Sequence, residues 1–416
     1  MPRMPPPRGR LALYAIGFVL VVSLAALAPH LSRAQARADV GVTFAGGWHA
    51  RIPFELRTQH IWVRGQVNGS DSVWIVVDSG AGSSVLDEEL ATSLKLHVSG
   101  HHEALGAGGA QAGTSVEDVT IRLPGVSLHR REMDTIDLSA FRAQAGRPMQ
   151  AIVGHELFEA CVVRFDYAAG MIDLWDARHP PAGMAGVAIP LTFSENLPYV
   201  DGVLDVPGRG QLRGRFVLDT GSGLALMLAP DVVQRESLAT AFPRTLVGIG
   251  RGVGGELRNR VGRARKFTLG TLEFASPTVV MPDSGAGRIS VRGSLGNIGG
   301  QMLGRCRVTF DYSRKLVRFE PGSGFDRPFE ADMLGATLMR TAQGLAVRWV
   351  NAETPAAEAG LQVGDLVMSI DGEPWQGLDP ATLRQRFQVE GQRVRLDLHR
   401  VGAPWREVSV KLRRLI

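Results

Sequence analysis

The sequence has 416 residues, of which 44% are hydrophobic and 21% are charged. This length allows two or three domains, and the mixture of apolar and charged residues excludes a disordered or fibrous protein. Fifty glycines beside only 6% aromatic residues are typical of a β protein with many turns.

Residues 1–38 have the pattern of an export signal. Three arginines precede an apolar run over residues 11–28, and alanines follow at positions 34, 36 and 38. A run of about 18 residues is at the short limit for a helix that spans a membrane. Two alternatives therefore remain: a signal peptide removed after Ala36 or Ala38, or an uncleaved N-terminal membrane anchor.

The formal net charge of +5 comes entirely from this segment. It contains five arginines and no acidic residue, so residues 39–416 carry 41 basic and 41 acidic side chains. A neutral chain gives no argument for binding nucleic acid. Residues 381–416 still hold nine Lys and Arg against three acidic residues, which we interpret as a solvated face rather than a patch for a membrane or an acidic partner.

Residues 51–86 alternate like β-structure, with Asn68-Gly69 as a hairpin signal. The glycine-rich stretches 106–109 and 248–255 predict two mobile hairpin tips. Proline and glycine at 180–183 indicate the end of a first lobe, and a similar stretch at 320–324 indicates the end of a second.

These lobes are predicted to be copies of each other. A hydrophobic strand that ends in Asp-Ser/Thr-Gly occurs at Asp78 and again at Asp219, and Phe-Asp-Tyr follows 88 and 92 residues later. The segments around Phe-Asp-Tyr align without a gap at an offset of 145, which pairs Cys161 with Cys306. We interpret this as duplication of a whole lobe, with the first lobe at 48–185 and the second at 186–325.

The chemistry that the repeat predicts needs both copies. One Asp-Ser-Gly is a common turn, and we interpret a third copy at Asp283 as an ordinary loop because no buried strand precedes it. Two carboxylates held close together cannot both ionise, so they share a proton and can activate a water molecule. General acid–base hydrolysis of this kind needs neither a metal nor a nucleophilic side chain.

The repeats resemble retropepsin-like aspartic proteases, here fused in one chain as in exported bacterial aspartyl proteases. The resemblance covers residues 48–414 and implies a mainly β fold with two pseudo-symmetric β-barrel lobes. It implies that Asp78 and Asp219 are catalytic. The residues it implies as support are Ser79 and Thr220, which brace the pair, the turn glycines Gly80 and Gly221, and Ile152-Val153-Gly154 behind the first turn. The second lobe departs from this pattern with Asn297-Ile298-Gly299, where a polar residue replaces an apolar one.

The two turns also differ after the glycine, where Ala81 stands in the first lobe and Ser222 in the second. Only a serine can donate a hydrogen bond to its neighbouring carboxylate, and a donor favours the charged form. We therefore expect Asp219 to carry the negative charge and Asp78 the shared proton. The expected optimum is mildly acidic, at roughly pH 4.5–6.5.

Residues 334–414 resemble a bacterial PDZ domain. The specific part is Ala359-Gly360-Leu361-x-x-Gly364-Asp365, followed by Ile370-Asp371-Gly372. The resemblance implies a loop whose N–H groups hold a peptide's terminal carboxylate while the peptide adds as a strand. Its residues are Gly344, Leu345, Ala346 and Val347. The alternative is a PDZ domain that only packs on the protease.

Cys161 and Cys306 are the only cysteines. Because they are equivalent in the repeat and the protein is predicted to be exported, they form either a disulfide between the lobes or two buried thiols. No residue spacing indicates a metal, and His101-His102-Glu103 is interpreted as a solvated loop. We expect no cofactor.

The sequence thus predicts an exported aspartic endopeptidase, periplasmic or anchored to the inner membrane and facing the periplasm. Its expected partners are protein or peptide substrates, recruited by the PDZ domain through their C-terminal tails. The alternative is a non-catalytic peptide-binding scaffold of the cell envelope. A homodimer with one lobe from each chain is needless, because one chain contains both Asp turns.

Overall fold

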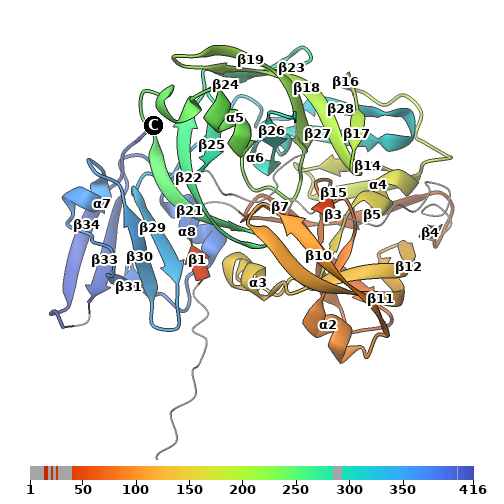
Figure 1. The fold of residues 1–416 in the computed structure, drawn as a ribbon, viewed down its shortest axis with the longest axis horizontal. Helices are drawn as coiled ribbons and strands as arrows, with labels where there is room; N and C mark the ends of the chain where they lie inside the picture. Colours follow the sequence, from red (N-terminus) through yellow and green to blue (C-terminus); the bar gives the residue numbers. More distant parts are fainter. Residues whose placement is uncertain (1–13, 17–19, 22–24, 27–39, 284–292, 401) are drawn as a thin grey trace, which may run out of the picture. The chain divides into compact units, whose positions relative to one another are not determined.

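The computed structural model describes residues 14–16, 20–21, 25–26, 40–283, 293–400 and 402–416 (Figure 1). The chain divides into two compact units. Among the described residues, the large unit comprises 20–21, 25–26, 40–283 and 293–331 with Leu415–Ile416 and holds both Asp turns, whereas the small unit comprises 332–400 and 402–414 with 14–16. Most of the predicted export signal lies outside the described residues.

The first half of the large unit is built on a mixed sheet. Strands β7 (His60–Val67) and β8 (Val73–Val77) form a hairpin. Its turn residues Asn68 and Gly69 both have positive φ, 45° and 79°, as the two-residue turn predicted there requires. Strand β13 (Ala151–Val153) pairs in parallel with β8 and antiparallel with β9 (Val85–Asp87), which in turn pairs in parallel with β12 (Val126–Ile136).

The second half repeats this topology strand for strand. Strands β18 (Leu197–Val206) and β19 (Gly210–Leu218) are the hairpin. Strand β26 (Gly296–Ile298) pairs in parallel with β19 and antiparallel with β20 (Leu226–Leu228), and β20 pairs in parallel with β25 (Thr278–Pro282). Equivalent strands pair in the same direction, parallel or antiparallel, in both halves. This confirms that the repeat is a structural duplication. Closure of each half into a barrel stays a prediction.

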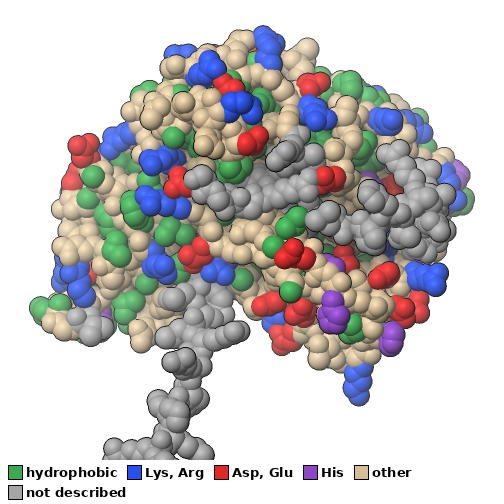
Figure 2. Space-filling model, in the orientation of Figure 1, with side chains coloured by type: hydrophobic (Ala, Val, Ile, Leu, Met, Phe, Trp, Pro, Cys, Tyr) green, Lys and Arg blue, Asp and Glu red, His purple; other side chains and the backbone are tan. Residues whose placement is uncertain are grey.

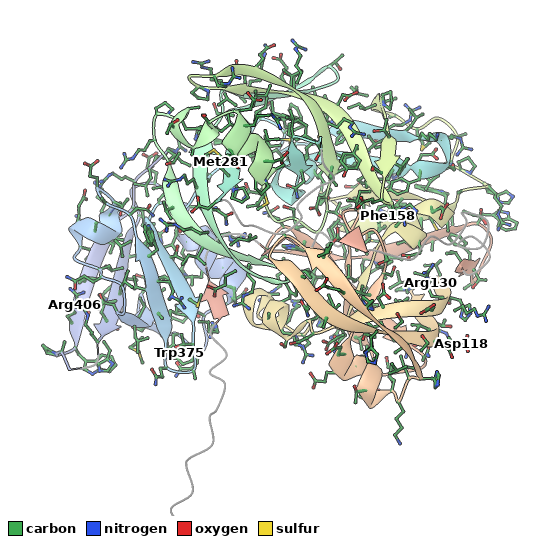
Figure 3. All side chains as sticks on the ribbon, viewed as in Figure 1. Asp118, Arg130, Phe158, Met281, Trp375 and Arg406 are labelled. Carbon is green, nitrogen blue, oxygen red and sulfur yellow. The ribbon has the colours of Figure 1, made fainter. Side chains whose placement is uncertain are left out.

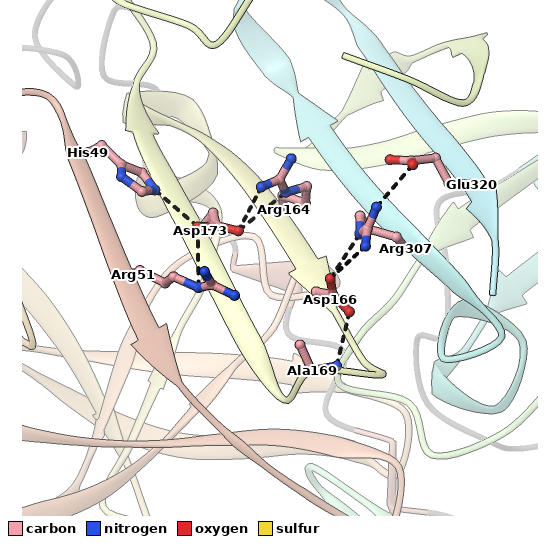
Figure 4. Close-up of polar contacts among 8 residues, drawn as sticks. All are labelled: His49, Arg51, Arg164, Asp166, Ala169, Asp173, Arg307 and Glu320. Atoms are coloured by element: carbon pink, nitrogen blue, oxygen red, sulfur yellow. Dashed lines mark hydrogen bonds and ion pairs between the residues drawn. The ribbon is translucent and has the colours of Figure 1, made fainter. Parts of the chain in front are cut away.

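A third sheet joins the halves. Its strand order is β16 (Val187–Pro190), β28 (Leu316–Pro321), β27 (Cys306–Asp311), β14 (Cys161–Asp166), β15 (Met171–Asp176) and β5 (His49–Pro53). The central pair β14 and β27 is antiparallel, with Arg164 opposite Thr309. Asp166 accepts a hydrogen bond of 2.9 Å from Arg307, which also contacts Glu320 at 3.1 Å (Figure 4). The pseudo-two-fold axis therefore passes through this sheet.

Aromatic side chains fill the core beside the third sheet. Phe158 lies on α4 (His155–Ala160), which follows β13, and is fully buried (Figure 3). Its ring is stacked on Tyr312 at 5.4 Å and meets Phe310 edge-on at 5.4 Å. Both partners belong to the second half, so one apolar core spans the two lobes and holds them together.

The same sheet rules out the predicted disulfide alternative. Cys161 and Cys306 are both free and buried. Extending the register of β14 with β27 places Cys306 opposite Tyr167, six residues along the strand from Cys161. This is about 20 Å, whereas a disulfide needs Cα atoms within about 7 Å. The cysteines are equivalent but lie too far from the axis to meet, and burial raises the pKa of each thiol to about 12.

The small unit has its own core and a sheet with the strand order β1-β29-β30-β31-β33-β34. The strands are β1 (Tyr14–Ile16), β29 (Ala336–Arg340), β30 (Leu345–Val350), β31 (Leu366–Ile370), β33 (Arg393–His399) and β34 (Arg406–Lys411). Helix α8 (Pro380–Arg386) is capped by Asp379, whose carboxylate accepts a hydrogen bond from the Ala381 amide. The first turn of this helix contains a proline.

The remaining elements connect or flank these sheets. The helices are α2 (Glu88–Ser93), α3 (Ser139–Ala145), α5 (Pro230–Arg235), α6 (Gly300–Leu303), α7 (Pro355–Glu358), η1 (Leu238–Thr240) and η2 (Tyr312–Arg314). The strands are β2 (Leu20–Val21), β3 (Ala25–Ala26), β4 (Val40–Phe44), β6 (Glu55–Arg57), β10 (Val98–Gly106), β11 (Gly109–Leu123), β17 (Thr192–Ser194), β21 (Leu246–Gly252), β22 (Gly255–Arg263), β23 (Lys266–Leu269), β24 (Leu272–Ala275) and β32 (Glu373–Pro374).

Candidate active site

The two Asp turns are built in the same way. Each aspartate directly follows a strand whose last three residues are buried, β8 before Asp78 and β19 before Asp219. The Asp78 amide donates to the Val153 carbonyl at 2.9 Å, and the Asp219 amide donates to the Ile298 carbonyl at 3.0 Å. The apolar strands thus fix the backbone of both turns from behind. Both aspartates have no exposed surface.

Hydroxyl groups tie the two turns together, as the sequence predicts for Ser79 and Thr220. The Ser79 amide donates to Thr220 Oγ1 at 2.9 Å, and the Thr220 amide donates to Ser79 Oγ at 3.1 Å. Each hydroxyl then donates onward, Ser79 to the Leu218 carbonyl at 2.9 Å and Thr220 to the Val77 carbonyl at 3.0 Å. Every one of these bonds crosses from one lobe to the other.

The turn glycines bring the carboxylates face to face. Asp78 Oδ1 accepts hydrogen bonds from the Gly80 amide at 2.7 Å and from the Gly221 amide at 3.0 Å. A Cβ on Gly80 would lie 2.4 Å from Asp219 Oδ1, and a Cβ on Gly221 would lie 2.1 Å from Asp78 Oδ2. Each glycine therefore makes room for the carboxylate of the other lobe, and no larger residue fits.

Burial and charge act together on this pair. Removal from water raises the pKa of Asp78 well above its usual value, and the negative charge of Asp219 raises it further. The Gly80 and Gly221 amides act in the opposite sense but do not outweigh these causes. Asp78 therefore holds a proton at pH values where a free aspartate has lost it. Which of the two carboxyl groups carries the shared proton stays a prediction.

Ser222 does not play its expected part. Its hydroxyl is buried and makes no hydrogen bond, so it does not donate to Asp219. Asn297 does this instead, with its Nδ2 2.6 Å from Asp219 Oδ2. The signal in the sequence was the departure of Asn297 from the apolar pattern, which predicted weaker support for the second turn rather than a hydrogen bond to its carboxylate.

A second residue that the sequence analysis missed is His60, at the start of β7. It is fully buried, and its Nε2 lies 3.1 Å from the Gly221 carbonyl oxygen, to which it must donate. Its Nδ1 lies 3.1 Å from Thr58 Oγ1. His60 holds the turn of the second lobe from the first lobe. No sequence motif identifies His60, because it lies outside both Asp turns in the sequence.

Two glycine-rich hairpins meet at their tips, where the sequence predicts hairpin tips. One hairpin is β10 with β11, and the other is β21 with β22. The Gly108 amide donates to the Val253 carbonyl at 2.7 Å, and a Cβ on Gly108 would lie 2.3 Å from the Gly255 nitrogen. Ala107 and Val253 are fully buried. The predicted mobility of the tips stays a prediction.

Each tip side chain packs into the opposite lobe. Val253, from the second lobe, belongs to an apolar cluster of the first lobe that includes Trp62, Ala81 and Val85. Ala107, from the first lobe, packs with second-lobe residues. These are Leu224, Met227, Leu257, Val261 and Val280. Each hairpin therefore reaches across to the other lobe, and we call the two hairpins crossed.

The loop predicted to hold a peptide carboxylate in the small unit is not available for that role. Gly344 directly precedes β30, and Leu345, Ala346 and Val347 lie in this strand, which is an inner strand of the sheet. Leu345 and Ala346 pair with β29 on one side and with β31 on the other. The Gly344 amide donates to Thr341 Oγ1 and the Val347 amide to the Asp365 carbonyl. The prediction of this loop was wrong, because β29 and not β30 lies at the edge of the domain's own sheet.

Basic and acidic side chains both occur on the face in view, with several acidic ones close together at the lower right (Figure 2). Ion pairs of the described residues include Arg265 with Asp205 at 3.3 Å and Lys266 with Glu273 at 2.6 Å. Among the described residues, no three His, Cys, Asp or Glu side chains are placed to hold a metal ion. None of the helices in the described part of the chain is both long and apolar enough to cross a membrane.

Comparison with known proteins supports two regions of the chain. Residues 63–157 match the family model described as aspartyl protease, and residues 347–400 match the model described as PDZ domain. No curated protein matches the chain. Among solved structures, an aspartic proteinase from Irpex lacteus is similar with 13% sequence identity and a TM-score of 0.42, over 67% of this chain and 98% of that chain. Two regions of this mainly β chain thus match the models for aspartyl proteases and PDZ domains.

Proposed function

We propose that this protein is an aspartic endopeptidase that hydrolyses peptide bonds with Asp78, Asp219 and an activated water. The observation that carries this proposal is the pair of buried carboxylates, each positioned against the turn glycine of the other lobe. Burying two carboxylates together is costly, and a protein that only binds peptides gains nothing from it.

The pair supports acid–base chemistry without a covalent intermediate. With one proton shared, the ionised carboxylate takes a proton from the water as its oxygen attacks the carbonyl carbon. The protonated carboxyl gives its proton to the carbonyl oxygen, which yields a tetrahedral diol. The carboxyl that took the water's proton then gives it to the nitrogen, and the other carboxylate takes a proton back from a diol hydroxyl. The C–N bond breaks, which releases an amine and a carboxylic acid and restores the singly protonated pair.

A peptide in extended form fits the crossed hairpins. Strands on two sides of a two-fold axis run in opposite directions, so one extended chain that passes both must be parallel to one and antiparallel to the other. The N-terminal strands of this chain do this: β2 pairs in parallel with β21, and β3 pairs antiparallel with β10. Backbone pairing of this kind binds peptides irrespective of their side chains.

For the PDZ domain, we propose that extended segments add to β29. Strand β1 of this chain pairs antiparallel with β29 in this way, with Ile16 opposite Leu338. A peptide in that direction has its C-terminal end beside Leu334 and Gly335, whose amides both donate to Asp332 Oδ1 at 3.0 Å. Asp332 thus occupies the amides that a terminal carboxylate needs, so we propose internal segments as ligands in place of the predicted C-terminal tails.

The composition of residues 1–38 supports export, and we propose that the protein works in the periplasm or anchored to the inner membrane on that side. Cleavage of the segment and anchoring by it remain the two alternatives.

The test is to incubate residues 39–416 with a diverse peptide mixture across pH and to identify new termini by mass spectrometry. Asp78→Asn and Asp219→Asn should each lower hydrolysis by roughly a thousandfold or more, since each carboxylate has a separate role. Circular dichroism should show both variants folded. Peptides that bind without being cut by the wild type would instead establish the non-catalytic scaffold.

A further inference from the structure

Asn297 makes a side-chain hydrogen bond to the acid pair, and the residue at the equivalent position of the first lobe cannot make one. It lies on β26, beside the strand that carries Asp219, and its side chain has no exposed surface. Its Nδ2 donates to Asp219 Oδ2 at 2.6 Å, whereas its Oδ1 has no hydrogen-bond partner. The amide thus presents only its donor side to the site.

The first lobe has no such donor. Ile152 on β13 pairs with Val76, and Asn297 on β26 pairs with Val217. Val76 and Val217 each precede the catalytic aspartate of their lobe by two residues, so Ile152 occupies the place that Asn297 has in the second lobe. An apolar side chain there cannot donate to Asp78. Asp78 accepts instead from the Gly80 and Gly221 amides, both at Oδ1.

We infer that Asn297 is a positioning residue that fixes Asp219 as the ionised member of the pair and thereby Asp78 as the acid. The inference rests on the proposed function and deepens it. A hydrogen bond to a charged acceptor is stronger than one to a neutral acceptor, so the donor favours the state in which Asp219 is charged. The proton of the attacking water then goes to Asp219, and Asp78 gives its own proton to the carbonyl oxygen.

The other ionisable groups near the two aspartates stay the same when Asn297 is replaced. Burial, then the negative charge of Asp78, raises the pKa of Tyr312 well above its usual value, so Tyr312 stays neutral. His60 reaches the pair through the Gly221 carbonyl. The Asn297 amide donates to Asp219 and not to either of these groups, so replacing Asn297 changes the donor at Asp219 and leaves these groups in place.

The first test uses Asn297→Leu, which keeps a similar volume and removes the donor. The acid limb of the kcat/KM profile, where the pair takes up its second proton, should move up by roughly one pH unit. The alkaline limb, where Asp78 loses its proton, should move much less, since Asp219 is already charged there. An acid limb that stays in place, or equal movement of both limbs, would overturn the inference.

A second test needs no activity. In the full chain labelled with ¹³C at the aspartate carboxyl groups, NMR titration should show Asp219 ionising at lower pH than Asp78, with signals assigned through Asp78→Asn and Asp219→Asn. The double variant Ile152→Asn with Asn297→Ile moves the donor to the other lobe and should reverse this order. If Asp78 ionises first in the wild type, Asn297 does not set the assignment. Failure of hydrolysis with the expected titration order would count against the proposed function alone.

Discussion

Ser79 and Thr220 exchange hydrogen bonds across the pseudo-two-fold axis, each amide donating to the hydroxyl of the other residue at 2.9 and 3.1 Å. The same hydroxyls donate to the Leu218 and Val77 carbonyls, at the ends of the strands that carry the aspartates. All of these groups are buried. The two turns therefore form one rigid unit, although 141 residues separate them in the sequence.

Replacing Thr220 tests this unit. Thr220→Ala leaves the Ser79 amide and the Val77 carbonyl buried without their partner, so we expect the free energy of unfolding to fall by about 2–4 kcal/mol. Thr220→Ser keeps the hydroxyl and should lose about 1 kcal/mol or less, for one buried methyl group. Urea unfolding measures both. Equal losses in the two variants would show that the methyl group, and not the hydrogen bonds, matters.

Stability should depend on pH through Asp78. Because burial raises its folded-state pKa, the folded protein holds a proton that the unfolded chain releases above an ordinary aspartate pKa of about 3.9. The stability from this group is present below that pH and is lost as the pH rises through the raised pKa. Asp78→Asn cannot ionise, so its free energy of unfolding should improve relative to wild type as the pH rises above about 4.

Denaturant unfolding of the two proteins at several pH values checks this expectation. Asp173→Asn, at an ion-paired carboxylate away from the turns, provides a control for the loss of any one acidic group. A difference between wild type and Asp78→Asn that stays constant over the range would mean that Asp78 ionises normally in the folded state.

The N-terminal strands β2 and β3 should restrain the proposed peptidase activity while they are attached. Strands β2 and β3 occupy the edges of β21 and β10, where a substrate peptide would pair. Because a tethered competitor acts at millimolar effective concentration, residues 39–416 should have a kcat/KM at least about tenfold above that of the full chain. A synthetic peptide of residues 18–28 should compete with substrate when added to residues 39–416. Equal activity of both chains would count against this pairing.

The PDZ domain should not distinguish a free from an amidated peptide C-terminus. Asp332, whose pKa burial raises to about 6, already accepts the Leu334 and Gly335 amides. Calorimetry on the full chain should therefore give similar Kd values for both forms at pH 8. Asp332→Ala frees the amides, and the free acid should then bind roughly tenfold tighter than the amide. A preference for the free acid in the wild type would restore the prediction of terminal-tail recognition.

The duplication could be predicted from the sequence because each copy combines an Asp-Ser/Thr-Gly motif with a Phe-Asp-Tyr at a similar distance along the chain. Asp78 and Asp219 were predicted to be partners, and the structure places them together, since local turn chemistry and apolar strands determine each copy separately. Of the two alternatives for the cysteines, the structure has the buried thiols and not the disulfide, for a geometric reason. Equivalence of Cys161 and Cys306 says nothing about their distance from the axis, which only the register of β14 with β27 reveals.

Two further differences have the same origin. Whether Gly344 leads into an edge strand or an inner strand depends on long-range pairing, which a short motif does not encode. Ser222 and Asn297 both carry polar groups near Asp219 in principle, but the path of β26 decides which one reaches the carboxylate. The sequence thus predicted that the second turn differs from the first, and only the packing identified the donor.

The crossed hairpins also give the site a direction. A two-fold symmetric site would accept a peptide equally well from either end, since reversing the chain exchanges equivalent surroundings. Here the two tips are unequal: Val253 fills the aromatic-lined cluster around Trp62, and the smaller Ala107 faces aliphatic and methionine side chains. The surroundings of an extended peptide between the two tips would therefore differ at its two ends.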